Sequence, residues 1–357
     1  MPEFLLINEP DSIVSELTKF NLVGVDTEFM REKTFFAELC LVQISTGERI
    51  YCVDPLTANS MGACWRQLME STWVVHSARQ DIEVVYQSAK RMPTEIFDTQ
   101  IAAGLLGYAP QLGYAGLVSE LFDVEIAKTH TRADWSRRPL SDAVLEYAAE
   151  DVEYLLPAFD ILTERLDKQG RLTWAREDSA QLLNPNLYDA DPLLAIDRLK
   201  GARNLRGDRR AVATHLAAWR EKEALRTNRP RQWIVKDNTL IEMAHARPSS
   251  TDELNQIEGL AAGLIRRSGE SILAAITAAL SDEIDYCPPL PPDESQKSLL
   301  KSMQKLVAEC ASELELAAET VASKRELNSI IASGGMQSKV LSGWRREVIG
   351  DRLLGLM

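Results

Sequence analysis

The sequence is poor in cysteine, and this scarcity excludes several classes of protein. Its 357 residues include five cysteines, an odd number in which no two form a C-x-x-C pair. This pattern argues against a disulfide framework and against a zinc site built from cysteines. We therefore expect reduced thiols in a cytoplasmic protein, because disulfides rarely persist in that compartment.

Long hydrophobic runs are also missing. No run of about 18 apolar residues is present to span a membrane. The N-terminal residues contain no basic segment followed by an apolar one, so they do not resemble a signal peptide. We expect a chain without membrane contact, and its length predicts two or three domains.

The chain lacks an overall excess of positive charge, because its formal net charge is −13. Taken as a sum, this charge argues against nucleic acid, whose phosphates require cations. The charge is unevenly distributed, however, since residues 200–236 contain eleven basic and three acidic residues. This basic segment fits two interpretations equally, a nucleic-acid surface or a solvated helix face with internal ion pairs.

Short apolar runs bounded by turn residues predict strands in the first hundred residues. A hairpin turn is expected at Thr46-Gly47-Glu48, between two of these runs. Because the later strands alternate with helical segments, the pattern predicts an α/β layer with a mixed central sheet flanked by helices. The expected strands are 4–8, 22–29, 37–45, 49–53, 72–76 and 95–98, and the expected helices are 60–70, 80–90, 99–107 and 114–121.

The strand pattern nearly disappears after Gly170. Just before it, Ser141 is expected to cap a helix that reaches about 155, where Pro157 either kinks it or starts a second helix. Residues 171–204 are expected to be helical with a loop at 184–191, and four prolines between 288 and 292 predict an extended linker. The expected domains are an α/β domain over 1–170, a helical linker over 171–207, and two all-α helical bundles over 208–286 and 293–357.

Two acids share one face of an expected buried strand. Asp26 and Glu28 alternate along the apolar run that begins at Leu22, so both side chains point to the same side. Acids in a protein interior are costly unless a cation or a hydrogen-bond donor compensates them. The pattern is weak by itself, because most acid-x-acid pairs at strand ends are simply solvated.

Two further signals are equally weak in isolation. Tyr147 and Asp151 are four residues apart on an expected helix and therefore share a face. A half-buried tyrosine beside a surface acid would explain them as well. Asp81 follows a strand near the start of a helix, where the helix dipole alone favours an acid.

The three signals gain specificity because the residues around them resemble a single family. In order and spacing they are similar to the exonuclease motifs of ribonuclease D. The matching segments are Val25-Asp26-Thr27-Glu28-Phe29, His76-Ser77-Ala78-Arg79-Gln80-Asp81, Asp134-Trp135-Ser136-Arg137-Arg138-Pro139-Leu140 and Tyr147-Ala148-Ala149-Glu150-Asp151-Val152. The resemblance covers the whole chain, because residues 219–248 look like the helical HRDC module that this family shares with RecQ-type helicases, and 341–347 resembles its C-terminal end.

The resemblance implies an RNase H-like exonuclease domain followed by two HRDC-like helical domains. It also implies a 3′→5′ exoribonuclease that removes nucleotides one at a time and releases 5′-monophosphates. Two divalent ions, Mg²⁺ or Mn²⁺, would be held by the matching acids Asp26, Glu28, Asp81 and Asp151. Tyr147 and Glu28 would be the catalytic residues, and Tyr147 is expected to orient the attacking water because a tyrosine with a pKa near ~10 is a poor base.

The expected substrate contacts are less specific, and each has a plain structural alternative. Phe29 and Met30 follow Glu28 and could stack on the last base, although Phe29 fits a core position equally well. Trp219 and Trp233 are interpreted as core residues rather than as platforms for bases. The remaining expected contacts are polar: Gln80, Arg137 and Arg138 near the acids, and Lys222, Arg226, Arg229 and Arg231 in the basic segment.

RNA is the expected partner. The resemblance implies transfer RNA precursors and small structured RNAs with free 3′ ends as substrates, and a monomeric enzyme. Two alternatives stay open. A 3′→5′ DNA exonuclease would use the same acids, because only recognition of the 2′-hydroxyl separates the two polymers. An inactive RNA-binding scaffold is disfavoured, since all four acids and the tyrosine are present.

Overall fold

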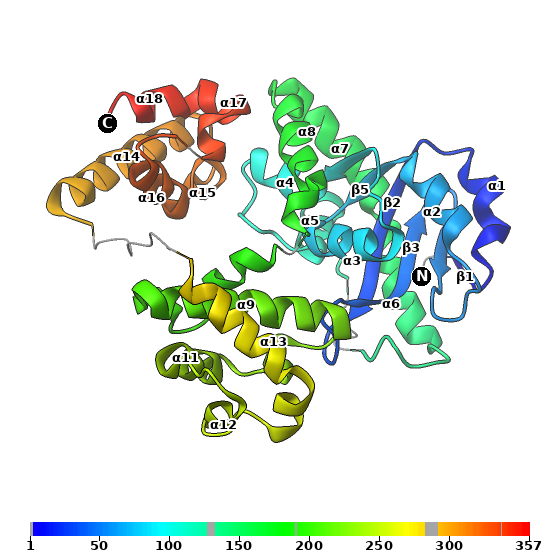
Figure 1. Cartoon of the computed structure of the whole chain (residues 1–357). Coiled ribbons are helices and arrows are strands. Elements are labelled where there is room, and N and C mark those ends of the chain that lie inside the picture. The colour runs from blue at the N-terminus through cyan, green and yellow to red at the C-terminus, as the bar shows by residue number, and fades with distance from the viewer. Residues whose placement is uncertain (1–2, 127–132, 190, 283–291, 337) are drawn as a thin grey trace. The chain divides into compact units, whose positions relative to one another are not determined.

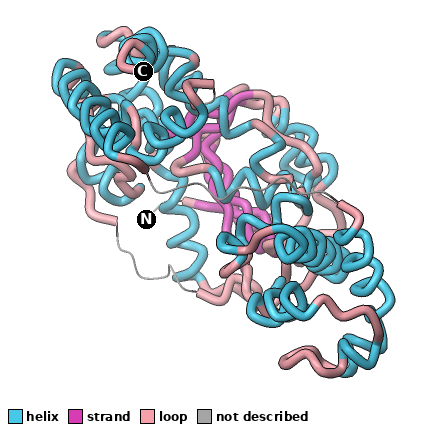
Figure 2. The backbone as a smooth tube through the Cα atoms, turned by 60° about the vertical axis from the view of Figure 1, so that its left-hand side comes forward, coloured by secondary structure: helices cyan, strands magenta, loops and turns pink. Residues whose placement is uncertain are grey.

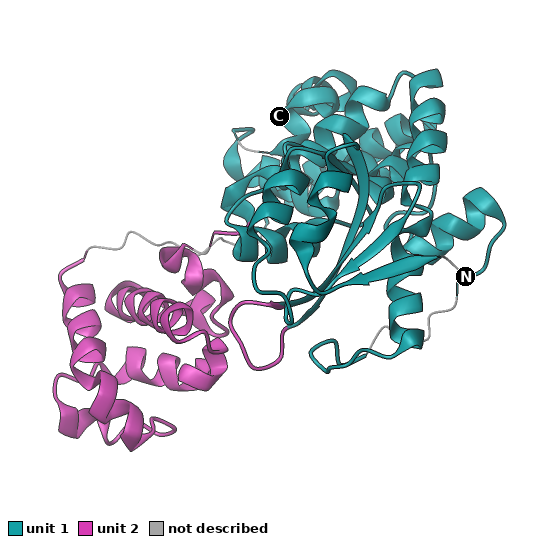
Figure 3. Cartoon of the chain, turned by 90° about the vertical axis from the view of Figure 1, so that its right-hand side faces the viewer, with its two compact units in different colours: residues 1–30, 39–187, 292–357 teal, residues 31–38, 188–291 magenta. Residues whose placement is uncertain are grey.

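The chain, described by a computed structural model, falls into two compact units (Figure 3). Unit 1 comprises Met1–Met30, Leu39–Leu187 and Pro292–Met357, and unit 2 comprises Arg31–Glu38 and Tyr188–Pro291. The structure describes residues 3–126, 133–189, 191–282, 292–336 and 338–357, so most of the predicted proline linker lies outside the described residues. None of the helices in these ranges is long and apolar enough to cross a membrane.

A six-stranded mixed sheet forms the centre of the first part of unit 1, in the strand order β1-β4-β3-β2-β5-β6 (Figure 1). Strands β3 and β4 pair antiparallel, as the predicted hairpin requires, whereas β1 runs parallel to β4 and β5 runs parallel to β2 and β6. Each strand lies within one residue of its predicted range. Their bounds are β1 Phe4–Ile7, β2 Leu22–Met30, β3 Glu38–Ser45, β4 Ile50–Val53, β5 Thr72–Val75 and β6 Glu95–Asp98.

Helices flank this sheet, which confirms the α/β prediction (Figure 2). Pro157 starts a second helix rather than kinking the first, because it occupies the first turn of α7, where its missing N–H has no intrahelical partner to lose. Gly24 of β2 allows α7 to come close, since a Cβ at this position would lie 3.1 Å from Leu155 Cβ. The helices are α1 Val14–Leu17, α2 Gly62–Met69, α3 Arg79–Ala89, α4 Thr99–Leu105, α5 Tyr114–Phe122, α6 Asp142–Glu153, α7 Leu155–Lys168 and α8 Leu172–Ala180.

The C-terminal module of unit 1, residues 292–357, has its own apolar core, which includes Met303, Leu327 and Ile349. Gly334 ends α16 in the left-handed conformation, so the chain turns at Gly334-Gly335 after this helix. Its elements are α14 Glu294–Glu313, α15 Ala318–Val321, α16 Lys324–Ser333, the turn η6 Lys339–Leu341, α17 Gly343–Arg345, the π-helical segment η7 Arg346–Gly350, and α18 Asp351–Leu354.

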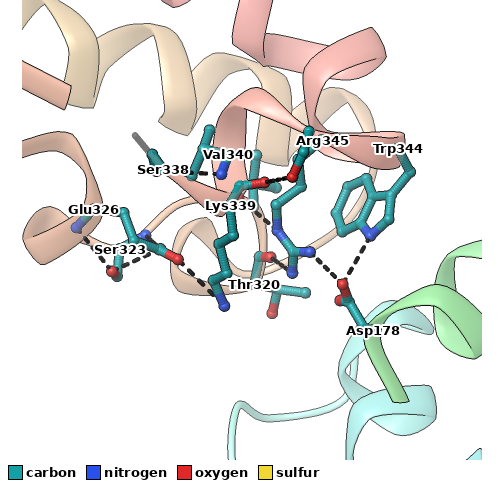
Figure 4. A network of polar contacts seen from close by, with 11 residues as sticks. Asp178, Thr320, Ser323, Glu326, Ser338, Lys339, Val340, Trp344 and Arg345 are labelled. Carbon is teal, nitrogen blue, oxygen red and sulfur yellow. Dashed lines mark hydrogen bonds and ion pairs between the residues drawn. The ribbon is translucent and has the colours of Figure 1, made fainter. Parts of the chain in front are cut away.

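Side chains of the C-terminal module bind directly to α8 (Figure 4). Arg345 Nη1 donates to Asp178 Oδ1 at 2.5 Å, and the Trp344 indole N–H donates to the same oxygen at 3.3 Å. The rings of Trp344 and Trp174 stack in parallel with their centroids 4.4 Å apart. The guanidinium of Arg345 also donates to the Thr320 carbonyl, so it holds the module together while it joins the module to α8.

Unit 2 is helical, as the sequence predicts, and its core includes Leu216, Met243 and Ile272. The predicted helical region before α9 consists of 3-10 turns, over residues 192–198 and 202–204. Pro192 begins the turn η4 behind an Asp191 cap, and Gly201 has a positive φ of 89° that an α-helix does not allow. The elements are η4 Pro192–Arg198, η5 Ala202–Asn204, α9 Gly207–Thr227, α10 Arg231–Ile234, α11 Asp237–Ala246, α12 Thr251–Leu254 and α13 Ala262–Leu280.

Residues 31–38 leave the sheet after β2 and pack within unit 2. Asn228, just after α9, accepts hydrogen bonds on its side-chain oxygen from the backbone N–H groups of Phe35 and Phe36, at 3.1 and 3.0 Å. The guanidinium of Arg231 lies over the Phe35 ring, 4.4 Å from its centroid. The chain therefore passes through unit 2 between two neighbouring strands of the sheet.

Candidate active site

Strand β2 presents the first two predicted acids from the middle of the sheet. Val23, Val25 and Thr27 are buried, and Asp26 and Glu28 alternate with them along the strand. The hydroxyl of Thr27, which stands between the two acids, donates to Asp81 Oδ1 at 2.6 Å. This bond fixes the third acid, which lies in the first turn of α3, beside β2.

Helix α6 supplies the fourth acid and the tyrosine. Leu145, Ala148 and Val152 bury one side of the helix against the sheet. Tyr147 and Asp151 are one turn apart and are joined by a hydrogen bond between the phenol and the carboxylate. The predicted shared face is therefore present, and it faces the acids of β2.

Three of the four acids converge closely enough to share a metal ion. One carboxylate oxygen from each of Asp26, Glu28 and Asp151 lies within 4.8 Å of the other two. Among the described residues this is the one group of three or more His, Cys, Asp or Glu that comes so close. Asp81 is not part of this trio, but its charge is near enough to raise the pKa of Asp26, Glu28 and Asp151.

The carboxyl groups are hard to ionise without a cation. Burial, followed by repulsion from Asp151 and Asp81, raises the pKa of Glu28 to about 8. Burial raises the pKa of Asp151 to about 7, against the opposing hydrogen bond from Tyr147. The pKa of Asp81 rises to about 6 by burial, although the Thr27 hydrogen bond lowers it. Burial and the three neighbouring acids hold the pKa of Asp26 well above its usual range.

This donor set fits divalent cations. All the converging atoms are carboxylate oxygens, which Mg²⁺ and Mn²⁺ prefer to the nitrogen and sulfur ligands of zinc sites. A cation would remove the electrostatic cost that burial and like charges impose on the cluster. The acids are therefore suited to divalent metal rather than to structural ion pairs.

The phenol of Tyr147 stays protonated at neutral pH. Burial, and then the charges of Asp151 and Glu28, raise the pKa of its phenol well above the usual value. The centroid of its ring lies 6.3 Å from the ring centroid of Trp135. Trp135 is buried and belongs to the segment 134–140, which precedes α6 and resembles the exonuclease motifs. The hydroxyl beside the acids is thus a hydrogen-bond donor at neutral pH, as expected for a group that orients rather than deprotonates.

The turn before α3 depends on a residue that the sequence analysis did not identify. The carboxylate of Asp98 accepts hydrogen bonds from the backbone N–H groups of Ser77 and Ala78, at 3.1 and 2.9 Å, and from Gln100 N at 2.8 Å. Ser77 has a positive φ of 60°, so the turn is held in a left-handed conformation. Asp98 thereby places the start of α3, which carries Asp81. Its position before α4 carries an N-cap signature that could have revealed the capping role alone.

The residues around the acids have varied exposure. Gln80 is exposed beside Asp81, and Phe29 and Met30 are half-buried at the end of β2. Met30 packs against the core, so part of its surface is unavailable to a base. His76 is held on both ring nitrogens, by the Thr99 hydroxyl at 2.9 Å and the Leu112 carbonyl at 3.0 Å.

Arg138 has a structural position instead of the expected phosphate contact. Its Nε and Nη2 atoms bind both carboxylate oxygens of Asp54, at 2.6 and 2.7 Å. The remaining N–H groups donate to the carbonyls of Cys40, Trp135 and Arg137. All five donors of the guanidinium are used, so none is left for a phosphate. The neighbouring Arg137 is exposed.

Two cations of the basic segment are engaged by acids of α9. Arg226 forms a surface pair with Glu223 at 2.7 Å. Arg231 binds the fully buried carboxylate of Glu221, with one contact at 2.5 Å, and stacks on Phe35. For Arg231 the ion-pair interpretation of the basic segment therefore holds, and its guanidinium ties α9 to the 31–38 segment.

Other residues of the same segment face solvent. Lys222 and Arg229 are exposed. Trp219 packs against the core of unit 2 and donates its indole N–H to Ser271, so its interpretation as a core residue is confirmed. The same interpretation was wrong for Trp233, whose exposed fraction is 60%.

Comparisons with known proteins agree with this arrangement. The 3′-5′ exonuclease family matches residues 7–167, the HRDC domain matches 209–276, and the C-terminal HRDC domain of ribonuclease D matches 295–353. The ribonuclease D of Gluconacetobacter diazotrophicus is 37% identical over 96% of this chain and 89% of its own length, and that of Acidiphilium cryptum is 37% identical over 99% and 93%. The solved structure of Escherichia coli RNase D, described as an exoribonuclease involved in structured RNA processing, superposes with a TM-score of 0.88 at 27% identity, over 99% of this chain and 98% of that one.

Proposed function

Because the chain belongs to the ribonuclease D family and is a 3′→5′ exoribonuclease, we propose that its four buried acids hold two divalent ions, Mg²⁺ or Mn²⁺, at the 3′ end of an RNA. The observation that carries this proposal is the convergence of Asp26, Glu28 and Asp151 within 4.8 Å. Asp81, held by Thr27 and close enough to influence the other three electrostatically, completes the set. Bound ions of this kind activate a water and stabilise the charge on the phosphate and the leaving oxygen.

The chain's own residues then position the reactants. Tyr147 keeps its proton and is hydrogen-bonded to Asp151, so its hydroxyl is placed to orient the attacking water. Glu28, whose carboxylate lies within 4.8 Å of those of Asp26 and Asp151, serves both as a ligand and as a partner for the water or the terminal 3′-hydroxyl. Phe29 and Met30 follow it on β2 and contact the last base.

The substrate is proposed to be a structured RNA with a free 3′ end, in particular a transfer RNA precursor, which a monomer shortens one nucleotide at a time. The description of the E. coli relative as an enzyme of structured RNA processing supports this substrate class. Further polar contacts with RNA are assigned to groups left exposed at the surface, which are Gln80, Arg137, Lys222, Arg226 and Arg229.

A gel assay with a 5′-labelled transfer RNA precursor bearing a short 3′ trailer tests the proposal. With Mg²⁺ or Mn²⁺ we expect a ladder that shortens by one nucleotide at a time, and no ladder with EDTA or with Asp151→Ala. A ladder that survives Asp151→Ala would overturn the assignment of the acids. A DNA oligonucleotide of the same sequence is the matched control, and equal cleavage of DNA would favour the DNA exonuclease alternative.

A further inference from the structure

Unit 2 contains a cavity of about 690 Å³, and its lining residues are far from the four acids in the sequence. This volume falls within the range of roughly 300–1,000 Å³ that is usual for ligand sites. The cavity lies between the end of α9, the short helix α10 and the start of α13. Its lining includes Arg226, Arg229, Trp233, Gly263 and Arg267.

Trp233 supplies a large aromatic surface to this cavity. Its side chain is 60% exposed on α10, and among the described residues its indole has no hydrogen-bond or ring partner. By contrast, Trp219 on the neighbouring α9 is anchored to Ser271 and to the core. An exposed tryptophan without a structural partner offers an open ring surface for stacking, and nucleic-acid bases stack on such surfaces regardless of sequence.

The cavity also carries an excess of positive charge. Its charged lining consists of Glu223 and the three arginines, Arg226, Arg229 and Arg267. Glu223 is paired with Arg226, whereas Arg229 and Arg267 form no ion pair with any residue that the structure describes. Apart from the longer-range attraction between Arg267 and Glu223, these two guanidinium groups are available to bind an anion beside the tryptophan.

The first turn of α13 adds a third favourable feature. This helix has 19 residues, and Ala261 at its N-cap provides no side-chain hydrogen bond to the turn. A Cβ at Gly263 would lie 3.4 Å from Arg267 Nη1 and 3.8 Å from Arg266 Nη2, so both guanidinium groups lie over this turn. The helix dipole disfavours cations at an N-terminus and favours a phosphate, which the backbone N–H groups and the arginines would bind together.

We propose that this cavity is a binding site for single-stranded RNA, in which a base stacks on Trp233 and the adjoining phosphate lies at the start of α13 between Arg229 and Arg267. The inference rests on the proposed function and deepens it, because it places the RNA contact proposed for Arg229 in a defined site of unit 2. The contact is blind to base sequence, since neither a stacked ring nor a phosphate identifies a base. It is selective for polymer that is unpaired, because only a splayed base can reach the indole.

The test is a binding measurement on the full chain in EDTA, with a fluorescein-labelled single-stranded oligouridylate as the probe and fluorescence anisotropy as the readout. We expect Trp233→Ala to raise Kd about 10-fold, the effect of losing one stacked base. Trp233→Phe should recover most of the affinity because it keeps an aromatic face. Arg229→Ala combined with Arg267→Ala should reduce the slope of log Kd against log salt concentration by about 0.7, the contribution of one phosphate of a single strand.

Arg203→Ala is the matched control, because this exposed arginine of unit 2 lies outside the cavity. It should leave Kd within twofold of the unchanged protein. The proposal is overturned if Trp233→Ala binds within twofold of the unchanged protein, or if Arg203→Ala weakens binding as much as the change at Trp233. Since no hydrolysis occurs in EDTA, failure of this site is distinguishable from failure of the four-acid assignment, which the gel assay reports.

Discussion

Replacing Glu28 with glutamine is expected to make the metal-free protein more stable at alkaline pH, although it removes a proposed metal ligand. Burial and repulsion from Asp151 and Asp81 raise the pKa of Glu28 from 4.5 to about 8. Above that pH the folded protein must hold a charged carboxylate in a site that disfavours it. Glutamine has the same shape without the charge, so it removes this cost.

The size of the effect follows from the pKa of Glu28. A rise from 4.5 to about 8 corresponds to at most ~5 kcal/mol, at ~1.4 kcal/mol per pKa unit. The neighbouring acids share part of this cost as they titrate together, so we expect about 2 kcal/mol for the single change. That gain corresponds to an increase in Tm of roughly 4–8 °C for a domain of this size.

The pKa of Glu28 also determines how the stability difference between the two proteins changes with pH. A carboxyl whose pKa is higher in the folded state stabilises the fold below its unfolded pKa near 4.5, and this stabilisation is lost as the pH rises towards 8. At pH 5 the carboxyl and the amide are both neutral, so Glu28→Gln and the unchanged protein should have similar Tm values. The difference should grow between pH 5 and pH 8.5.

Thermal unfolding in EDTA and in Mn²⁺ provides the assay. In EDTA at pH 8.5 the Glu28→Gln protein should unfold at the higher temperature. In saturating Mn²⁺ the order should reverse, because the ion stabilises only a protein that binds it. Glu120→Gln, on the exposed side of α5, is the control and should shift Tm by less than about 1 °C in either condition. An equal or lower Tm for Glu28→Gln in EDTA at pH 8.5 would refute the reasoning.

Three further changes test other parts of the structure. Tyr147→Phe should lower kcat about 100-fold while the Mn²⁺ concentration for half-maximal rate stays nearly constant, and unchanged single-turnover rates would contradict its orienting role. Arg138→Ala should lower the free energy of unfolding in urea by ~3–5 kcal/mol, because Asp54 would remain buried without its partner. A loss below ~1 kcal/mol would argue against a structural role for the Arg138–Asp54 ion pair. Arg345→Ala should make the C-terminal module more sensitive to limited proteolysis, because its ion pair with Asp178 of α8 is lost. An unchanged cleavage pattern would show that the stacked Trp174 and Trp344 hold the module to α8 without that ion pair.

The strands and the acids could be predicted because their signals are local. Each strand is an apolar run between turn residues, and the spacing of Asp26 with Glu28 and of Tyr147 with Asp151 places each pair on one face. The convergence of these pairs is not local. It depends on how α6 packs against β2, and in the sequence only the family resemblance pointed to it.

The features that the sequence did not reveal all depend on distant partners. The Arg138 side chain could not be recognised as a clamp, because its acceptors, Asp54 and the Cys40 carbonyl, precede it by more than eighty residues. Asp98 could be recognised as a helix cap but not as the group that shapes the turn before α3. Trp233 was assigned to the core because tryptophan is usually buried, and only the packing of α10 leaves it exposed.

The interleaved course of the chain has a consequence for its synthesis on the ribosome. The segment 31–38 emerges early, but the groups that hold it, Asn228 and Arg231, are translated much later. In the same way α8 emerges well before Arg345, the arginine that binds its Asp178. A nascent chain that has already exposed all four acids therefore lacks the partners of both segments, so the catalytic groups exist before either unit can be completed.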